Sequence, residues 1–168
     1  MIQIYTGNGK GKTTAALGLI IRALGCNKKV ALVQFMKKNY QYSEINFLKD
    51  KPNIDIFQFG TAELVNPDNP SQIDFDEAEK AIKKCKTILK KQLYDLIVID
   101  EINVAVKWDL LSLEKQLSLM RYDAEMEIVM TGRYAAAEVI EQADLVTEMK
   151  EIKHYFKKGV KARKGFEF

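Results

Sequence analysis

A stretch rich in glycine and lysine near the N-terminus carries the clearest chemistry of the sequence. Residues 6–14 read Thr-Gly-Asn-Gly-Lys-Gly-Lys-Thr-Thr, between an apolar run at 2–5 and another at 15–21. Strand, glycine-rich turn and helix follow in the order of a phosphate-binding loop, whose backbone N–H groups and helix dipole attract an anion. Lys12 is expected to reach a bound phosphate, and the Thr13 hydroxyl to ligate Mg²⁺. A flexible surface turn, the alternative, does not require three alternating glycines beside Lys-Thr.

The spacing of the glycines departs from the standard phosphate loop. That loop has glycine five residues before Gly11, where this chain has Thr6, with Gly7 one step later. The dinucleotide motif G-x-G-x-x-G fits worse, because Gly7 and Gly9 would require a third glycine where Lys12 stands. Phosphate binding is therefore favoured over dinucleotide binding.

Two acids and one arginine are the other candidates for chemistry. Asp100 and Glu101 follow the apolar residues 96–99 and resemble a Walker B segment, in which a carboxylate at a strand end holds Mg²⁺ directly or through water. The alternatives are a helix N-cap for Asp100 and a solvent-facing Glu101. Arg133 has a planar guanidinium suited to phosphate, although a surface arginine after a turn is nearly as common.

Alternating strands and helices are predicted to position these residues. Apolar runs predict strands, and helical spacing predicts helices. One α/β domain over residues 1–168 with a mainly parallel sheet is expected, and ligands of such sheets bind beyond the carboxyl ends of the strands. Four polar clusters, at 6–14, 34–35, 100–101 and 131–133, should therefore meet at one edge. Strands are expected at 2–5, 29–35, 54–59, 95–101, 127–131 and 145–149, and helices at 13–24, 43–49, 74–93, 113–120 and 135–143.

The predicted helix ends carry local signals. Gly25 suits a left-handed cap for the first helix, which is apolar nearly all round and so is expected to be buried on more than one side. Asp74 is the expected N-cap of the third helix, with Glu77 as its capping-box partner. The loop 60–73, which directly precedes this third helix, is long enough to indicate a functional or mobile segment.

Bulk properties narrow the class of protein. The chain has 168 residues and a net charge of +3, which is too mild to indicate a nucleic-acid binder. Cys26 and Cys85 are expected to be buried thiols rather than a bridge. The sequence shows no secretory leader, and its most apolar run is interrupted by Arg22. We therefore expect no membrane span and a cytoplasmic location. His154 is the only histidine of the chain, so a histidine-based metal site is excluded, and His154 itself is expected to be structural.

The phosphate loop and several spaced motifs resemble the ATP:corrinoid (cobalamin) adenosyltransferase family. The similarity includes Thr6 at the departure described above, and it runs in one order along nearly the whole chain. The resembling segments are 6–16, 33–35, 99–103, 131–133, 143–149, 153–154 and 159–168.

The resemblance implies a three-layer RecA-like P-loop fold, usually dimeric, and an unusual use of ATP. The Co(I) form of a corrinoid attacks the 5′ carbon of ATP, triphosphate leaves, and a cobalt–carbon bond forms. The corrinoid is the substrate, ATP the co-substrate with Mg²⁺, and an electron donor such as reduced flavin or flavodoxin is implied, because Co(I) must be made from Co(II). Lys10, Lys12 and the loop amides are expected to stabilise charge on the leaving triphosphate.

Site residues follow from the motif and the resemblance. Lys12, Thr13 and Glu101 are expected to be catalytic, and Thr13, Asp100 and Glu101 to hold the metal. Residues expected to bind ATP are Thr6, Gly7, Asn8, Gly9, Lys10, Gly11, Lys12, Thr13, Thr14 and Arg133.

Two departures from larger members of the family concern the corrinoid and the N-terminus. Those members carry an extension before the first strand, which here starts at Ile2. They also carry a Gly-Phe-x-Trp-like segment after the third strand, where this chain reads Gly-Thr-Ala-Glu-Leu-Val from Gly60. Leu64 and Val65 are expected to form a weaker apolar wedge, with His154 also on the corrinoid side. Trp108 is expected to serve packing.

Two other functions stay open on the residues alone. An ATPase or phosphotransferase would use the same loop for γ-phosphoryl transfer. A nucleotide-dependent binding module would present the basic C-terminal segment, residues 150–164, to an acidic partner.

Overall fold

The computed structural model describes residues 1–38, 42–122 and 125–167. Phe168, the last residue of the predicted closing motif, lies outside them. The strands are β1 (Ile2–Thr6), β2 (Val30–Gln34), β3 (Ile54–Gln58), β4 (Leu96–Asp100), β5 (Glu127–Thr131) and β6 (Leu145–Glu148). The helices are α1 (Lys12–Gly25), α2 (Ser43–Leu48), α3 (Gln72–Lys91), α4 (Ile102–Lys107), α5 (Leu113–Met120), α6 (Ala137–Gln142) and the 3₁₀ helix η1 (Tyr155–Lys158).

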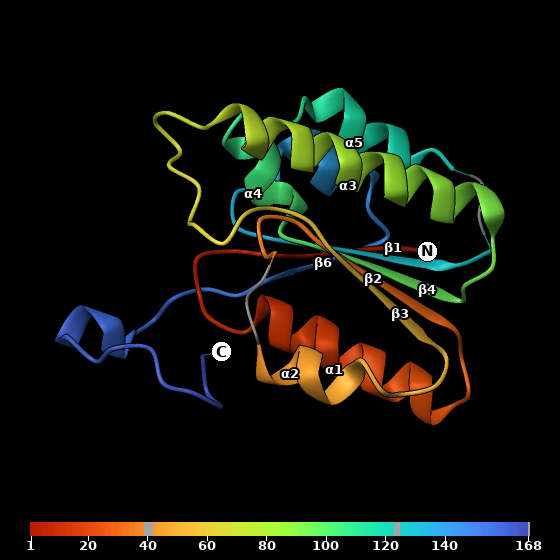
Figure 1. The fold of residues 1–168 in the computed structure, drawn as a ribbon, viewed down its shortest axis with the longest axis horizontal. Helices are drawn as coiled ribbons and strands as arrows, with labels where there is room; N and C mark the ends of the chain where they lie inside the picture. The colour runs from red at the N-terminus through yellow and green to blue at the C-terminus, as the bar shows by residue number, and fades with distance from the viewer. Residues whose placement is uncertain (39–41, 123–124, 168) are drawn as a thin grey trace.

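The six strands form one sheet in the order β3-β2-β4-β5-β1-β6, and every pair of neighbours is parallel. Helices α1 and α2 lie on one side of the sheet, and α3, α4 and α5 on the other (Figure 1). The predicted three-layer α/β fold with a parallel sheet is therefore confirmed. Because all strands run the same way, their carboxyl ends share one edge.

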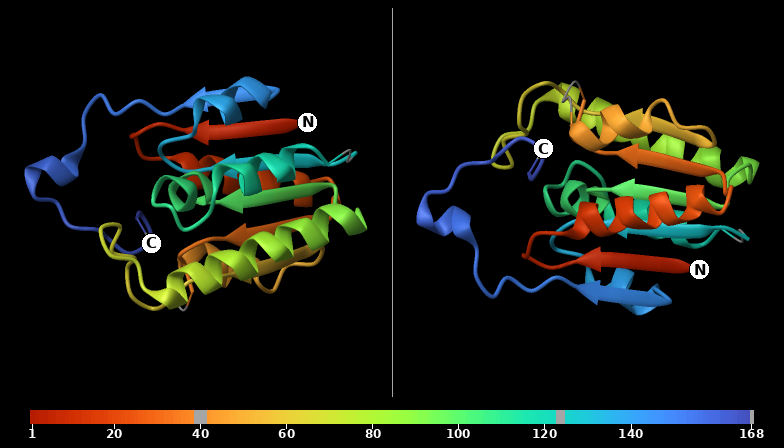
Figure 2. Two further views of the ribbon diagram at one scale, coloured as in Figure 1. Left: turned by 90° about the horizontal axis from the view of Figure 1, so that it is seen from above. Right: turned by 90° about the horizontal axis from the view of Figure 1, so that it is seen from below.

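Alternate residues of the central strands fill two separate cores. Val33, Ile97 and Ile99 face α3 and α5, whereas Leu32 and Val98 face α1 and α2. All five residues of β2 and of β4 are buried, as expected for parallel strands covered on both faces. The chain after β6 leaves the sheet, passes through η1 and returns toward its carboxyl edge (Figure 2).

Helix α1 differs from two expectations. Its buried residues are only Lys12, Ala16 and Ile20, and Ile21 is 55% exposed, so α1 is buried along one stripe rather than on more than one side. Gly25 lies inside the helix, and the left-handed residue that follows is Asn27 with φ 56°. Asparagine tolerates this conformation, which explains how the helix ends without a glycine cap.

The N-cap of helix α3 lies three residues before the predicted one. Ser71 is the true N-cap, and Asp74 is its capping-box partner: the Ser71 backbone N–H donates to Asp74 Oδ2 over 2.9 Å. The assignment of Asp74 and Glu77 as a capping box is therefore wrong. The helix also ends at Lys91, and Leu93 beyond it is 61% exposed.

Three further features correct or complete the sequence interpretation. Helix α4, Ile102–Lys107, was not predicted at all. Cys85 is buried as expected, but Cys26 is exposed. No helix within the described ranges is both long and apolar enough to cross a membrane.

Candidate active site

Asp100, the last residue of β4, is the meeting point of the predicted clusters. Its Oδ1 accepts hydrogen bonds from the hydroxyls of Thr13 at 2.9 Å and Thr131 at 2.6 Å. Its Oδ2 accepts from the Gln34 amide at 3.0 Å and from the Lys37 ammonium at 2.6 Å. These donors come from α1, β5, β2 and the loop after β2. The predicted convergence at the carboxyl edge is confirmed, and the alternative of Asp100 as a helix N-cap is wrong, because Glu101 occupies that position.

Burial and charge act in opposite directions on this carboxylate. Asp100 is fully buried, which by itself raises its pKa, but the Lys37 ammonium and the hydroxyl hydrogen bonds lower the pKa below its usual value. For Lys37 the directions are reversed. Burial alone would lower its pKa, but the carboxylates of Asp100 and Glu101 raise the pKa above its usual value. The two groups therefore form a charged, hydrogen-bonded pair at the floor of the site.

The glycine loop is pressed against the chain that leaves β6. Gly9 N–H donates to the carbonyl of Met149 over 2.6 Å, and Met149 N–H donates to the carbonyl of Thr6 over 2.8 Å. A Cβ on Gly7 or Gly9 would lie 2.6 Å from the Met149 oxygen, and Gly7 has φ 92°. Glycine is therefore required at 7, one step after the standard position, while Thr6 completes β1. This packing gives a physical reason for the departure noted in the motif.

Lys12 and Thr13 open helix α1 directly beside the buried acid. Lys12 is 8% exposed, and its ammonium donates to the Gly9 carbonyl over 2.6 Å, across the loop that precedes it. Burial lowers the pKa of Lys12, and Glu101 and Arg133 act on it in opposite directions. An anion bound beside the loop would raise the pKa of Lys12 again and so stabilise the charged ammonium.

Glu101 stands at the border between the floor and the cavity. It has the left-handed φ of 65°, and its backbone N–H donates to the Thr131 hydroxyl over 3.0 Å. Burial and the neighbouring Asp100 charge raise the pKa of Glu101. Within the described part of the chain, no hydrogen bond to its carboxylate is found, so this group is available to a ligand.

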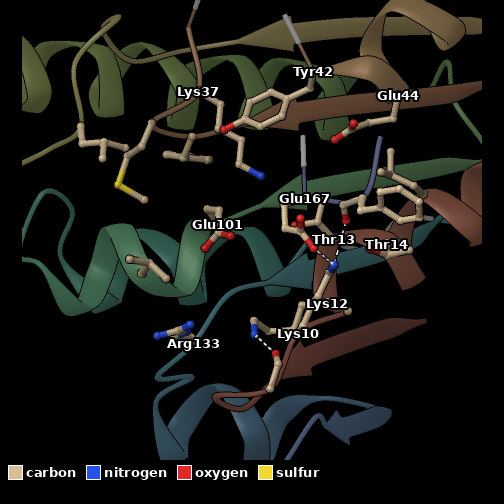
Figure 3. Close-up of a pocket in the computed structure, with 18 of the residues that line it drawn as sticks. Lys10, Lys12, Thr13, Thr14, Lys37, Tyr42, Glu44, Glu101, Arg133 and Glu167 are labelled. Carbon is tan, nitrogen blue, oxygen red and sulfur yellow. Dashed lines mark hydrogen bonds and ion pairs between the residues drawn. The ribbon is translucent and has the colours of Figure 1, made fainter. Parts of the chain in front are cut away.

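A cavity of about 810 Å³ opens above these residues, a size suited to a nucleotide together with part of a larger substrate. Figure 3 shows Lys37 and Tyr42 on one side of it, Lys12 and Thr13 on another with Arg133 beside Lys12, and Glu101 between the two sides. The arrangement combines cations that suit a polyphosphate with the Glu101 carboxylate, which suits a metal ion.

Part of the cavity lining is apolar. Leu64 and Val65 contribute to it from the loop 60–71, together with Phe35 and Trp108. Leu64 is 82% exposed, whereas Val65 also packs against the core. The structure therefore brings the two predicted wedge residues to the site, and Trp108 both packs and lines the cavity.

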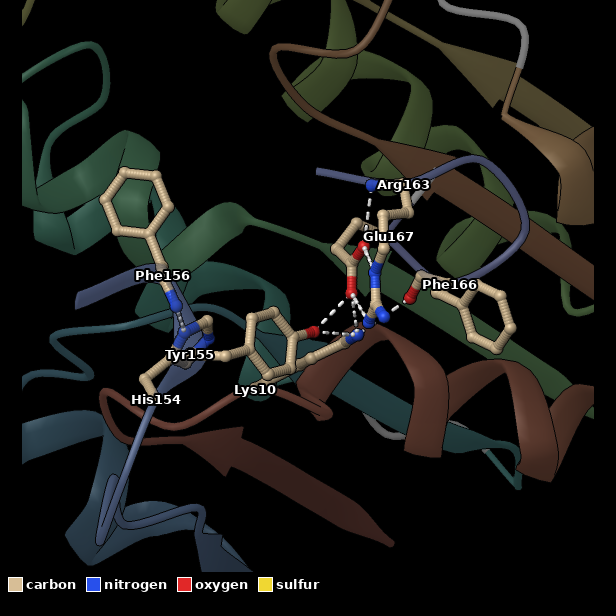
Figure 4. A network of polar contacts seen from close by, with 7 residues as sticks. All are labelled: Lys10, His154, Tyr155, Phe156, Arg163, Phe166 and Glu167. Carbon is tan, nitrogen blue, oxygen red and sulfur yellow. Dashed lines mark hydrogen bonds and ion pairs between the residues drawn. The ribbon is translucent and has the colours of Figure 1, made fainter. Parts of the chain in front are cut away.

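The C-terminal segment closes the remaining side through a polar network around Lys10 (Figure 4). The Lys10 ammonium donates to the Tyr155 hydroxyl at 2.8 Å, the Phe166 carbonyl at 2.8 Å and the Glu167 carboxylate at 2.7 Å. Arg163 donates its backbone N–H to Glu167 over 2.7 Å and lies over the rings of Tyr155 and Phe166. All three protons of Lys10 are thus directed to this segment, not to the cavity.

A family model described as ATP:corrinoid adenosyltransferase BtuR/CobO/CobP matches residues 1–168. The chain belongs to this family. A corrinoid adenosyltransferase of Pseudomonas aeruginosa is 37% identical over 169 residues, which cover 100% of this chain and 83% of that protein. One of Escherichia coli (strain K12) is 34% identical over 169 residues, covering 100% of this chain and 85% of that protein. The comparisons do not favour the alternative of an ordinary ATPase or phosphotransferase.

Most of the residues expected in this adenosyltransferase site line the cavity, but not all of them. Thr6, Gly7 and Asn8 do not, because they join the loop to β1 and to the chain after β6. Asp100 lies beneath the floor. His154 lines the cavity, yet its Nδ1 accepts the Phe156 N–H over 3.1 Å and so also caps η1. The predicted residues that line the cavity are Gly9, Lys10, Gly11, Lys12, Thr13, Thr14, Leu64, Val65, Glu101, Arg133 and His154.

Sequence reasoning missed several lining residues of this family member. Lys37, Tyr42 and Glu44 come from the chain between β2 and α2, and Phe166 and Glu167 come from the C-terminal segment. The only signal for the first group was its position after a strand that ends at the predicted ligand edge. The closing motif at 159–168 was the signal for the second.

The C-terminal network predicts a measurable effect of Glu167. Hydrogen bonds from Arg163 and Lys10 hold the pKa of Glu167 well below its usual range, so the carboxylate is ionised at neutral pH. Glu167→Ala removes the acceptor shared by both cations, and the segment 150–166 should then detach from the glycine loop. We expect trypsin, which cleaves after lysine and arginine, to cut this segment faster than in the unaltered protein.

Glu114→Ala is the matched control for this proteolysis experiment. It removes a carboxylate that pairs with Arg121 over 2.7 Å on an exposed surface of the molecule. Cleavage within 150–166 should keep its original rate in this variant. Equal cleavage rates for the Glu167 variant and the unaltered protein would show that the network does not hold the segment.

Proposed function

We propose that this protein transfers the 5′-deoxyadenosyl group of ATP to the Co(I) centre of a reduced corrinoid and releases triphosphate. The observation that carries the proposal is a single cavity that is lined both by cations and a glycine loop and by apolar side chains. Family membership supports the same reaction. ATP would occupy the charged side, and the corrinoid ring would approach from the side of Leu64 and Val65.

The reaction needs placement and charge stabilisation more than proton transfer. The Co(I) electron pair attacks C5′ of ATP, the Co–C bond forms, the C5′–O bond breaks, and its electron pair leaves with the triphosphate. Lys12, the loop amides and Arg133 would stabilise the charge that grows on this leaving group. No step requires a general base, which suits a cavity whose only histidine is engaged in capping η1.

The residues at the cavity floor suit Mg²⁺ as a companion of the triphosphate. The Thr13 hydroxyl has free lone pairs while it donates to Asp100, and Glu101 offers a carboxylate. Among the described residues, no group of three or more His, Cys, Asp or Glu could hold a metal ion alone. Mg²⁺ commonly binds through one or two carboxylates and substrate phosphates, so this donor set fits. When bound, the ion would neutralise charge on the triphosphate.

Other parts of the proposal concern the surroundings of the reaction. The protein would act in the cytoplasm as one domain over residues 1–168 and would receive Co(I) from a donor such as reduced flavin or a flavodoxin. A homodimer is supported by strand β6 at the sheet edge, whose four residues are all exposed. Leu145 and Val146 on this edge are 44% and 39% exposed, which is unusual for an unprotected strand.

One assay separates this function from γ-phosphoryl transfer. The protein is incubated with ATP, Mg²⁺ and chemically reduced cobalamin, and both the cobalt species and the phosphate product are identified. We expect a light-sensitive adenosylcorrinoid and triphosphate in equal amounts. Orthophosphate released at the same rate with and without the corrinoid would reject the proposal. Cobyrinate diamide as a second acceptor would show whether an incomplete corrinoid is also used.

A further inference from the structure

The ammonium of Lys37 occupies the position at which a metal ion would bind Asp100. The ammonium lies 2.6 Å from Asp100 Oδ2, and the lysine side chain is only 15% exposed. Within the described ranges, Lys37 is the only cationic side chain that contacts this carboxylate. The lysine is thus an internal counter-ion placed at the floor of the nucleotide cavity.

The carboxylate of Asp100 has no acceptor position left for a metal ion. An ionised carboxylate offers about four lone-pair sites, and four protein donors already use them. Three of these donors, Thr13, Thr131 and Gln34, are neutral and come from regular elements. Lys37 is the one charged donor, and its positive charge repels an incoming divalent cation. Its long side chain also lines the cavity.

The backbone around Lys37 is fixed, although the side chain has an exit toward the cavity. Lys37 N–H donates to the Phe59 carbonyl over 2.9 Å, and Met36 before it has φ 56°. A Cβ on Gly60 would lie 2.7 Å from Met36 Cα, so the two loops are packed backbone to backbone. The ammonium is therefore held over Asp100 by a rigid support.

We propose that Lys37 keeps free divalent metal ions away from Asp100, so that the metal enters this site only together with the nucleotide. The ammonium neutralises the buried carboxylate of Asp100. Glu101 remains beside it as a carboxylate that lines the cavity and to which no hydrogen bond is found among the described residues. One carboxylate and one hydroxyl give few ligands to a free ion, whereas phosphate oxygens would complete the set. Lys37 would thus act on the metal through Asp100, without contacting the nucleotide or the reacting atoms. The inference rests on the proposed function only for the identity of the nucleotide.

Binding of Mn²⁺ alone, without nucleotide, tests the inference by electron paramagnetic resonance. We expect Lys37→Gln and Lys37→Met to bind Mn²⁺ at least about tenfold more tightly than the unaltered protein, because a contacting positive charge is gone. Lys37→Arg, which keeps the charge, should remain like the unaltered protein. The glutamine side chain is neutral but polar, so this variant keeps the measurement possible if the methionine variant does not fold.

Two further variants assign the gained site. Lys37→Gln combined with Asp100→Asn should lose the added Mn²⁺ affinity, and Lys38→Met should never gain it, because Lys38 pairs with Glu77 instead. Equal Mn²⁺ affinity of the unaltered and Lys37→Gln proteins would overturn the inference. So would a gain that survives the loss of the Asp100 charge. Neither readout depends on adenosyl transfer, so failure of the proposed function is recognised separately in the product assay.

Discussion

Replacement of Lys12 by alanine is expected to lower the kcat of adenosyl transfer by about 10²- to 10³-fold, the cost of removing one preorganised charge donor at a leaving group. The Lys12 ammonium lies at the start of α1, donates to the Gly9 carbonyl and faces the cavity. Its charge matters most when negative charge grows on the triphosphate. The measurement is the rate of adenosylcobalamin formation at saturating ATP.

The same substitution should change folding stability little. Burial lowers the pKa of Lys12, so its charge is less stable in the folded protein than in water, and its removal breaks a single hydrogen bond. A change in the free energy of unfolding within about 1 kcal/mol is expected. Lys83→Ala, on the solvent-facing side of α3, removes an equal charge and should leave both kcat and stability unchanged. Near-normal turnover of the Lys12 variant would show that the glycine loop does not hold the triphosphate.

The fold was predictable wherever the apolar pattern had one interpretation. The continuous apolar runs of β2 and β4 indicated parallel strands covered on both faces, and both are buried throughout. Helix α4 failed this rule for a physical reason. Ile102, Val104 and Val106 alternate with period two, which is typical of a strand, and no side chain caps the helix start. The left-handed turn at Glu101 that begins it has no sequence signal beyond the adjacent acids.

The candidate site was predictable where residues belong to a contiguous motif. The glycine loop, Thr13 and the two acids follow strand ends, so the topology alone brings them together. Lys37 and Asp100 are 63 residues apart, and a lysine after a strand looks the same in sequence whether it is solvated or buried. Lys10 and Glu167 are 157 residues apart, and their contact depends on the path of an irregular segment. Such pairs are set by tertiary packing.

Replacement of Asp100 by alanine is the second large effect expected, in this case on stability. The change removes a fully buried acceptor and leaves Lys37 without its counter-ion and three neutral donors without their partner. Removal of one member of a buried ion pair typically costs about 3–5 kcal/mol, because the remaining charge is uncompensated. We expect a loss of unfolding free energy in this range, measured by urea denaturation, and loss of adenosyl transfer.

Asp95→Ala provides the matched control, since Asp95 immediately precedes the same strand and pairs with Lys28 over 2.9 Å on the surface. Water can replace its partners, so its removal should shift the urea midpoint far less than removal of Asp100. A double variant with Lys37→Met and Asp100→Ala should be less destabilised than the sum of the single changes, because it leaves no unpaired charge. Strict additivity would mean that the two side chains do not stabilise one another. In that case the buried carboxylate would be held by Thr13, Thr131 and Gln34 alone, and the metal-free floor of the site would carry a net negative charge.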